Sequence, residues 1–130
     1  MPTDAEIGKF LTERVLGWEL ESITYDHSHL TPEAIAILGG TTRTVWFKKD
    51  STQRIGDNFF LTWDGFGLLW NALVKAGRKP AIGSDYDVAG PCKQGAYVND
   101  DEGWPVLVID PDPCRALMLA AAKAYGMEGL

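Results

Sequence analysis

The sequence predicts a small α/β (α+β) protein built as one globular domain over residues 1–130. Two observations indicate this class. The chain has 130 residues and a hydrophobic content of 45%, which suits one domain with one core. Segments with helix-start signals and helical periodicity are also separated by short runs of β-branched and aromatic residues, and no repeat, linker or low-complexity tract divides them.

The first expected element is a helix over residues 4–16. Thr3 and Glu6 have the spacing of a capping box, in which each side chain satisfies a backbone amide of the other residue. Apolar residues then recur at three- and four-residue steps. Gly17 is expected to end the helix, because glycine accepts the left-handed conformation found at helix ends.

Residues 19–40 carry a weaker pattern. Within them, Thr31 precedes a proline and a glutamate, and this order predicts the cap of a short helix that ends at Leu38. Residues 42–48 are rich in β-branched and aromatic side chains and predict a strand. A second strand is expected over residues 58–63.

A helix is expected over residues 65–76, with Asp64 as its N-cap. Its apolar residues lie on one face, so it should pack against a sheet. Residues 80–103 are rich in Gly, Pro, Asp and Asn, and we expect loops there with one short strand near residues 96–98.

The carboxyl-terminal part predicts a strand followed by a helix. Residues 104–109 contain a continuous apolar run and predict a strand buried on both faces. Asp110 and Pro111 are expected to start the last helix, which should cover residues 115–125 because alanine, leucine and methionine dominate there.

Three core-forming segments carry a resemblance to a known family. They are the sequence Val15-Leu16-Gly17-Trp18, the amphipathic residues 63–74 and the closing residues 112–122. In this order they resemble the phage ABA sandwich domain family, small proteins encoded by phages and prophages. The resemblance implies a three-layer α-β-α sandwich, with helices on both faces of a small sheet, and a phage or prophage origin. It implies no catalytic residues.

Charge and hydropathy limit the partners. Twelve basic residues against 18 acidic ones give a net charge of −6, which disfavours direct nucleic-acid binding. No apolar run is long enough for a membrane span, and the first ten residues lack a signal-peptide pattern, so we expect a protein of the host-cell cytoplasm. Cys92 and Cys114 are expected to be reduced and structural, although Lys93 could activate Cys92. We expect no cofactor.

Both histidines lie in the sequence Asp26-His27-Ser28-His29. In an extended segment His27 and His29 would share a face and could bind a metal with a third ligand from elsewhere. A polar loop is the alternative that we prefer. His29 also begins a His-x-Thr motif of the kind used by two-histidine phosphoesterases, but a second copy of the motif is missing, and Thr31 is better explained as a helix cap.

Carboxylates gather at the two edges of the long loop, and one tryptophan follows the second group. No phosphate-binding loop, dinucleotide fingerprint or nucleophile elbow is found, so we predict no catalytic residues. A tryptophan that the core does not need can anchor a partner. The predicted partner-binding residues are Trp104, Asp100, Asp101, Glu102, Asp85 and Asp87.

The preferred hypothesis is therefore a non-enzymatic binding module that engages or inhibits a host protein. One form of this hypothesis is an anti-defence factor such as an anti-CRISPR. An acidic surface would speed association with a basic target. The alternative is a binder of a nucleotide signal, with Trp104 or Trp46 on the base and Arg78, Lys79 or Lys93 on the phosphate. A weaker alternative is a metal-dependent hydrolase built on the two histidines.

Overall fold

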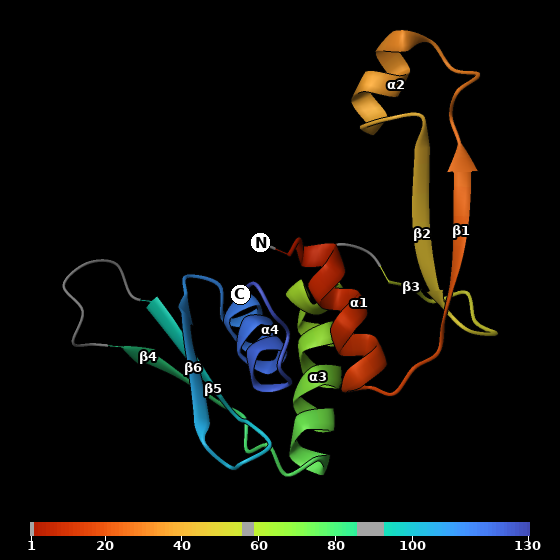
Figure 1. The fold of residues 1–130 in the computed structure, drawn as a ribbon. Helices are drawn as coiled ribbons and strands as arrows, with labels where there is room; N and C mark the ends of the chain where they lie inside the picture. The colour runs from red at the N-terminus through yellow and green to blue at the C-terminus, as the bar shows by residue number, and fades with distance from the viewer. Residues whose placement is uncertain (1, 56–58, 86–92) are drawn as a thin grey trace.

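The structure is a computed structural model that describes residues 2–55, 59–85 and 93–130 (Figure 1). Its helices are α1 (Asp4–Arg14), α2 (Pro32–Leu38), α3 (Trp63–Lys75) and α4 (Pro113–Ala124), with a 3-10 turn, η1, at Phe59–Leu61. Its strands are β1 (Leu20–Asp26), β2 (Thr42–Lys48), β3 (Arg54–Ile55), β4 (Ala81–Asp85), β5 (Lys93–Asn99) and β6 (Pro105–Asp110). The predicted mixed α+β class is confirmed.

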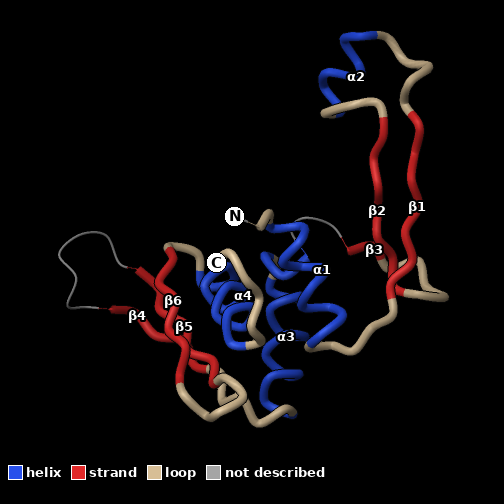
Figure 2. The backbone as a smooth tube through the Cα atoms, in the orientation of Figure 1, coloured by secondary structure: helices blue, strands red, loops and turns tan. Residues whose placement is uncertain are grey.

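The described strands form two separate antiparallel sheets, ordered β1-β2-β3 and β4-β5-β6. Helix α4 lies against the second sheet, and α1 and α3 lie on the other side of α4 (Figures 1 and 2). The described helices therefore cover one face of this sheet. From the sequence we expect helices on both faces of one sheet. The structure differs in this layering, because strand β2 belongs to a separate sheet that projects away from the helices.

The core is built around α4. Eight of its residues are buried, and five of these are alanines. Small side chains allow the sheet and two helices to approach its backbone closely. Around it pack fully buried side chains of the other elements, which include Ile7, Leu11, Phe60, Leu69, Leu73, Ala96 and Val98.

Two predicted helix caps are confirmed. The Thr3 hydroxyl accepts a hydrogen bond from the Glu6 amide at 3.2 Å, as the capping-box spacing predicts. The Thr31 hydroxyl accepts one from the Ala34 amide at 3.3 Å and starts α2. Both caps depend on contacts within three residues, which is why the local sequence identifies them.

The expected strand over residues 58–63 is wrong. Its described part forms η1 and then enters α3, which begins at Trp63. The N-cap of α3 is Thr62 and not Asp64, since the Thr62 hydroxyl accepts a hydrogen bond from the Gly65 amide at 3.2 Å. Gly65 packs directly on the backbone of η1, which leads into the cap at Thr62.

The start of the last helix is also shifted from its predicted position. The N-cap is Asp112, whose carboxylate accepts a hydrogen bond from the Cys114 amide at 2.9 Å, and α4 begins at Pro113. Asp110 instead ends β6. It accepts a hydrogen bond from the Asp112 amide at 3.0 Å and lies 3.3 Å from Nε of Arg115.

The sheet β4-β5-β6 contains more strand than the sequence predicts. In place of a loop with one short strand, β4 and β5 pair over five residue positions, although both contain glycine. Strand β6 is not buried on both faces, because its residues alternate between exposed and half-buried. Strands β1 and β3 were not predicted. Most residues of β1 are exposed, and a strand with no buried face carries no hydrophobic alternation by which it could be predicted.

Strands β1 and β2 with the intervening α2 form an arm, residues 20–48, that projects from the helices (Figure 1). The strands pair without a bulge from Leu20 opposite Lys48 to Asp26 opposite Thr42. At the base of the arm, the Lys48 ammonium lies 4.4 Å from the ring centre of Trp18. The tip is formed by α2, which has no buried residue.

An ion-pair network joins three elements of the core. The Arg115 guanidinium on α4 binds both carboxylate oxygens of Asp4 on α1, at 2.6 and 2.8 Å, and also reaches Asp110 at the end of β6. The hydrogen bonds to Asp4, more than the charges themselves, raise the pKa of Arg115. Both bonds to Asp4 come from Nη1 of Arg115, and they join α1 to α4.

None of the helices in the described ranges is both long and apolar enough to cross a membrane. Cys114 is buried, and burial raises the pKa of its thiol, which suits the expected structural role. Cys92, the second thiol of the sequence analysis, lies outside the described residues.

The contact of Gly65 with η1 predicts a large difference between two glycines of the same helix. A Cβ at position 65 would collide with the Phe59 carbonyl group, whereas one at position 67 meets nothing within 4 Å. Gly65→Ala should lower the free energy of unfolding by about 1–3 kcal/mol or more. Gly67→Ala should raise it by up to about 1 kcal/mol, because alanine is the better helix former.

Urea unfolding followed by circular dichroism measures both variants against the parent protein. Equal effects of the two substitutions would show that Gly65 does not pack on η1 as described.

Candidate functional site

Large apolar side chains are exposed on three parts of the described surface. Large exposed apolar patches are rare on monomeric proteins, and they often mark binding sites. On the arm they are Ile23, Tyr25, Ile37 and Leu38; on α3 they are Trp63, Leu68 and Val74; on the second sheet and its turn they are Tyr97, Trp104, Leu107 and Ile109.

The outer face of β4-β5-β6 is the side of this sheet that the helices leave uncovered. The register places Tyr97 of β5 opposite Leu107 of β6, and Gly95 opposite Ile109. Tyr97, Leu107 and Ile109 are 43%, 44% and 42% exposed. The Leu107 side chain reaches over Gly95. Its Cδ1 atom lies 3.4 Å from the position that a Cβ on Gly95 would occupy. Leu107 therefore covers Gly95, which is buried, and the outer face presents three apolar side chains to solvent.

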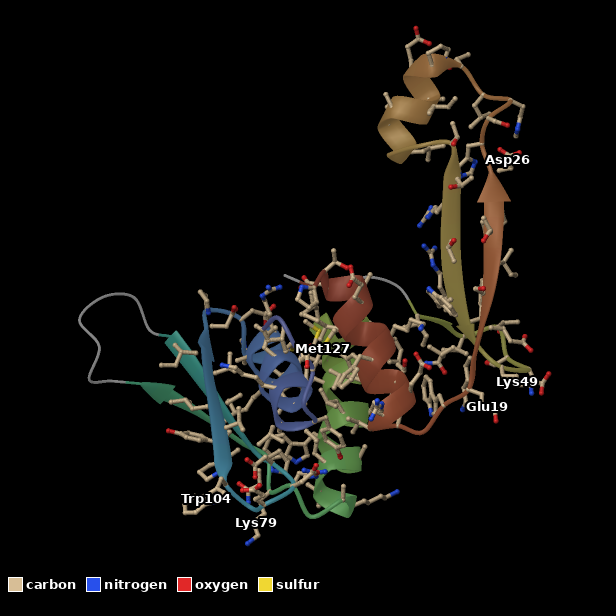
Figure 3. All side chains as sticks on the ribbon, viewed as in Figure 1. Glu19, Asp26, Lys49, Lys79, Trp104 and Met127 are labelled. Atoms are coloured by element: carbon tan, nitrogen blue, oxygen red, sulfur yellow. The ribbon has the colours of Figure 1, made fainter. Side chains whose placement is uncertain are left out.

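Trp104 lies in the turn between β5 and β6, at one end of this face. It is 68% exposed, so the expected exposure of this tryptophan is confirmed. Figure 3 shows it at the end of β6, on the side away from the helices. One carboxylate oxygen of Asp100 accepts hydrogen bonds from the amides of Glu102 and Trp104, both at 2.9 Å. Asp100 therefore holds the turn that presents the tryptophan.

Arg78 attaches this turn to the body of the protein. Its guanidinium forms an ion pair with Asp101, donates to the Asn99 carbonyl at 3.4 Å and lies 4.2 Å from the ring centre of Tyr125. Burial by itself would lower the pKa of Arg78, but the bond to Asp101 and the attraction of Tyr125 outweigh it and raise the pKa. Glu102 stays exposed beside the paired Asp101.

Asp85 ends β4, where it pairs with Lys93 of β5. The Trp104 turn follows Asn99, at the other end of the same strand β5. The structure therefore does not bring Asp85 next to Trp104. The side chain of Asp85 and the whole of Asp87 lie outside the described residues.

The two histidines lie at the tip of the arm, in the turn between β1 and α2. The His27 amide donates to the Thr41 carbonyl at 2.6 Å, and its carbonyl accepts from the Leu30 amide at 3.0 Å. This turn does not hold His27 and His29 in the extended form that would place them on one face. Among the described residues, no group of three or more His, Cys, Asp or Glu side chains comes close enough to hold a metal ion.

Asp26 organises the same turn. Its carboxylate accepts a hydrogen bond from the Ser28 amide at 2.8 Å. Above all this backbone hydrogen bond, with smaller contributions from the Ser28 hydroxyl and the two histidines, lowers the pKa of Asp26 from its ordinary value of 3.8.

The turn should therefore be sensitive to acid. Because the pKa of Asp26 is lower in the folded protein, the hydrogen bond to Ser28 is present above the ordinary value and is lost as the pH falls through the folded value. We expect the Ser28 amide resonance to titrate in NMR spectra with a midpoint below 3.8. Asp26→Asn should abolish this titration, and a midpoint above the ordinary value would contradict the assignment.

The exposed part of α3 borders an aromatic groove that the sequence analysis did not find. A hollow of about 310 Å³ is lined by Trp63, Phe66, Gly67, Trp70, Ile82 and Pro113. Phe66 stacks on Trp70 with ring centres 5.8 Å apart, and Trp63 meets Phe66 edge-on at 5.3 Å. The sequence places Phe66 and Trp70 on the apolar face of the expected helix and Trp63 in the strand expected over residues 58–63, so it does not bring the three rings together. The fully buried part of that face is Leu69 and Leu73.

The two tryptophans of the nucleotide hypothesis lie on different sheets, and Arg78 lies at the Trp104 turn. Trp104 belongs to the second sheet and Trp46 to the first. Arg78 is engaged by Asp101 and Tyr125. Lys79 lies near Trp104 in Figure 3, and the side chain of Lys93 is outside the described residues.

No family model matches the chain, and no curated protein or solved structure matches it either.

Proposed function

We propose that the protein is a binding module that docks a partner protein on the outer face of β4-β5-β6. The observation that supports this most strongly is the uncovered face itself, on which Tyr97, Leu107 and Ile109 are exposed side by side. Exposed apolar side chains grouped on one face can pack against apolar or aromatic side chains of a partner. Trp104 extends the surface with a large side chain that the core does not use.

The rim of this surface supports a partner with basic groups around its own apolar patch. Glu102 and the outer oxygen of Asp101 lie exposed beside Trp104, and the Asp101 side chain remains 80% exposed although it is paired with Arg78. The whole chain carries a net charge of −6. Complementary charge speeds encounter and selects against acidic partners.

The identity of the partner as a host protein follows from the resemblance to the phage ABA sandwich domain family and not from the geometry. In that setting the proposed action is to occupy a basic, functional surface of the host protein, as an inhibitor of a defence system would. The acidic rim and the apolar face supply the two kinds of contact that such a competitor needs.

Two tryptophans allow a matched test. Trp104 and Trp63 are both 68% exposed, but Trp63 lies on α3, away from the proposed surface. The tagged protein, Trp104→Ala and Trp63→Ala are used to capture proteins from a bacterial host lysate, and the captured protein is then purified and titrated by calorimetry. Trp104→Ala should weaken binding by about 2 kcal/mol, or roughly 30-fold, and Trp63→Ala should leave it unchanged.

The acidic rim adds an independent expectation, because association should slow as the salt concentration rises. If the captured protein instead requires Trp63 and not Trp104, the docking surface is the aromatic groove of α3 and the proposal is wrong. It is also wrong if no protein distinguishes the two variants.

A further inference from the structure

A second hollow lies between α1 and the first sheet, at the base of the arm. Its volume is about 290 Å³, and its lining includes Trp46 and three cationic side chains, Lys9, Arg43 and Arg54. Glu6 is the one acidic residue among the lining residues. Because Lys9 is paired with Glu13, the excess of positive charge at this hollow comes from the two arginines.

The two arginines lie on the same face of the first sheet, the face that carries Val45. Arg43 pairs across the sheet with Tyr25, and Arg54 pairs with Phe47 on the neighbouring strand. Both arginines line the hollow beside α1, and both also line a second one of about 300 Å³ on the arm. Both arginines are exposed, and two guanidinium groups that border one space give it a positive potential that attracts an anion. The arrangement therefore favours an anion as the occupant.

Lys9 and Trp46 complete the hollow. The Lys9 ammonium is held 3.1 Å from the Glu13 carboxylate and 4.5 Å from the ring centre of Trp46. Trp46 is half-buried, so its ring is positioned by the surrounding structure while part of it borders the hollow. An indole beside guanidinium groups is the combination that binds phosphate oxygens and an attached aromatic ring.

We propose that this hollow binds a small phosphorylated ligand, with Arg43 and Arg54 on the phosphate oxygens and Lys9 adding positive charge. Trp46 borders the place where the rest of the ligand would lie, and a nucleoside would stack there. The site shares no residue with the outer face of β4-β5-β6, so it is independent of the proposed protein partner. The cations beside Trp46 differ from those that the sequence analysis paired with it, because they come from α1, β2 and β3.

The test titrates the protein with pyrophosphate and with nucleoside diphosphates, followed by calorimetry and by amide shifts in NMR spectra. The double variant Arg43→Gln/Arg54→Gln should lose at least about tenfold in affinity for pyrophosphate, because each charged hydrogen bond is worth that much. Lys75→Gln, which removes an exposed cation on α3, is the control and should leave the affinity unchanged. Melting temperatures check that the variants fold.

The variant Trp46→Leu distinguishes a nucleotide ligand from a ligand that is recognised by its phosphate group alone. A nucleoside diphosphate that binds more tightly than pyrophosphate, and loses this advantage in Trp46→Leu, identifies a nucleotide ligand. Equal binding of the two probes, lost in the double variant, identifies the phosphate group as the recognised part. The proposal is overturned if the parent protein binds neither probe, or if Lys75→Gln weakens binding as much as the double variant. Trp104→Ala should bind both probes as the parent does, which keeps this result separate from the docking experiment.

Discussion

The burial of α4 on several sides is the constraint on which the rest of the fold depends. The helix lies between the sheet β4-β5-β6 and the helices α1 and α3, and its alanines allow all of them close to its backbone. Larger side chains at these positions would push the layers apart. Arg115 adds direction to this packing, since its Nη1 bonds to Asp4 and its Nε contact with Asp110 join α1 and β6 to the start of α4.

This packing also decides which surfaces remain free. Because one helix layer covers one face of the second sheet, the apolar side chains of the other face stay in water. The same hydrophobic alternation that places Ala96 and Val98 in the core places Tyr97 between them on the outside. The candidate docking surface is thus a direct consequence of the strand period combined with a helix layer on one side.

The hollow at the base of the arm has a different origin. It forms where α1 meets the first sheet, and its cations come from α1 and from the neighbouring strands β2 and β3, which follow α1 much later in the chain. The arm contacts the body through few side chains, among them Lys9 on Trp46 and Lys48 on Trp18. A bound anion at this junction would bridge α1 and the arm, whereas a protein partner would lie on the far sheet.

The sequence by itself determined the features that depend on contacts a few residues apart. These features are the caps at Thr3 and Thr31, strand β2, and the helical character of α1, α3 and α4. They follow from side-chain and backbone interactions between residues that are close in sequence. The sequence also singled out Trp104 as a tryptophan that the core does not need. Tertiary structure decided the rest, because each remaining choice compares distant partners. Thr62, and not Asp64, caps α3, where Gly65 packs on η1. The strands divide between two sheets according to which edges pair, and Lys9 joins Arg43 and Arg54 only when α1 packs beside the arm.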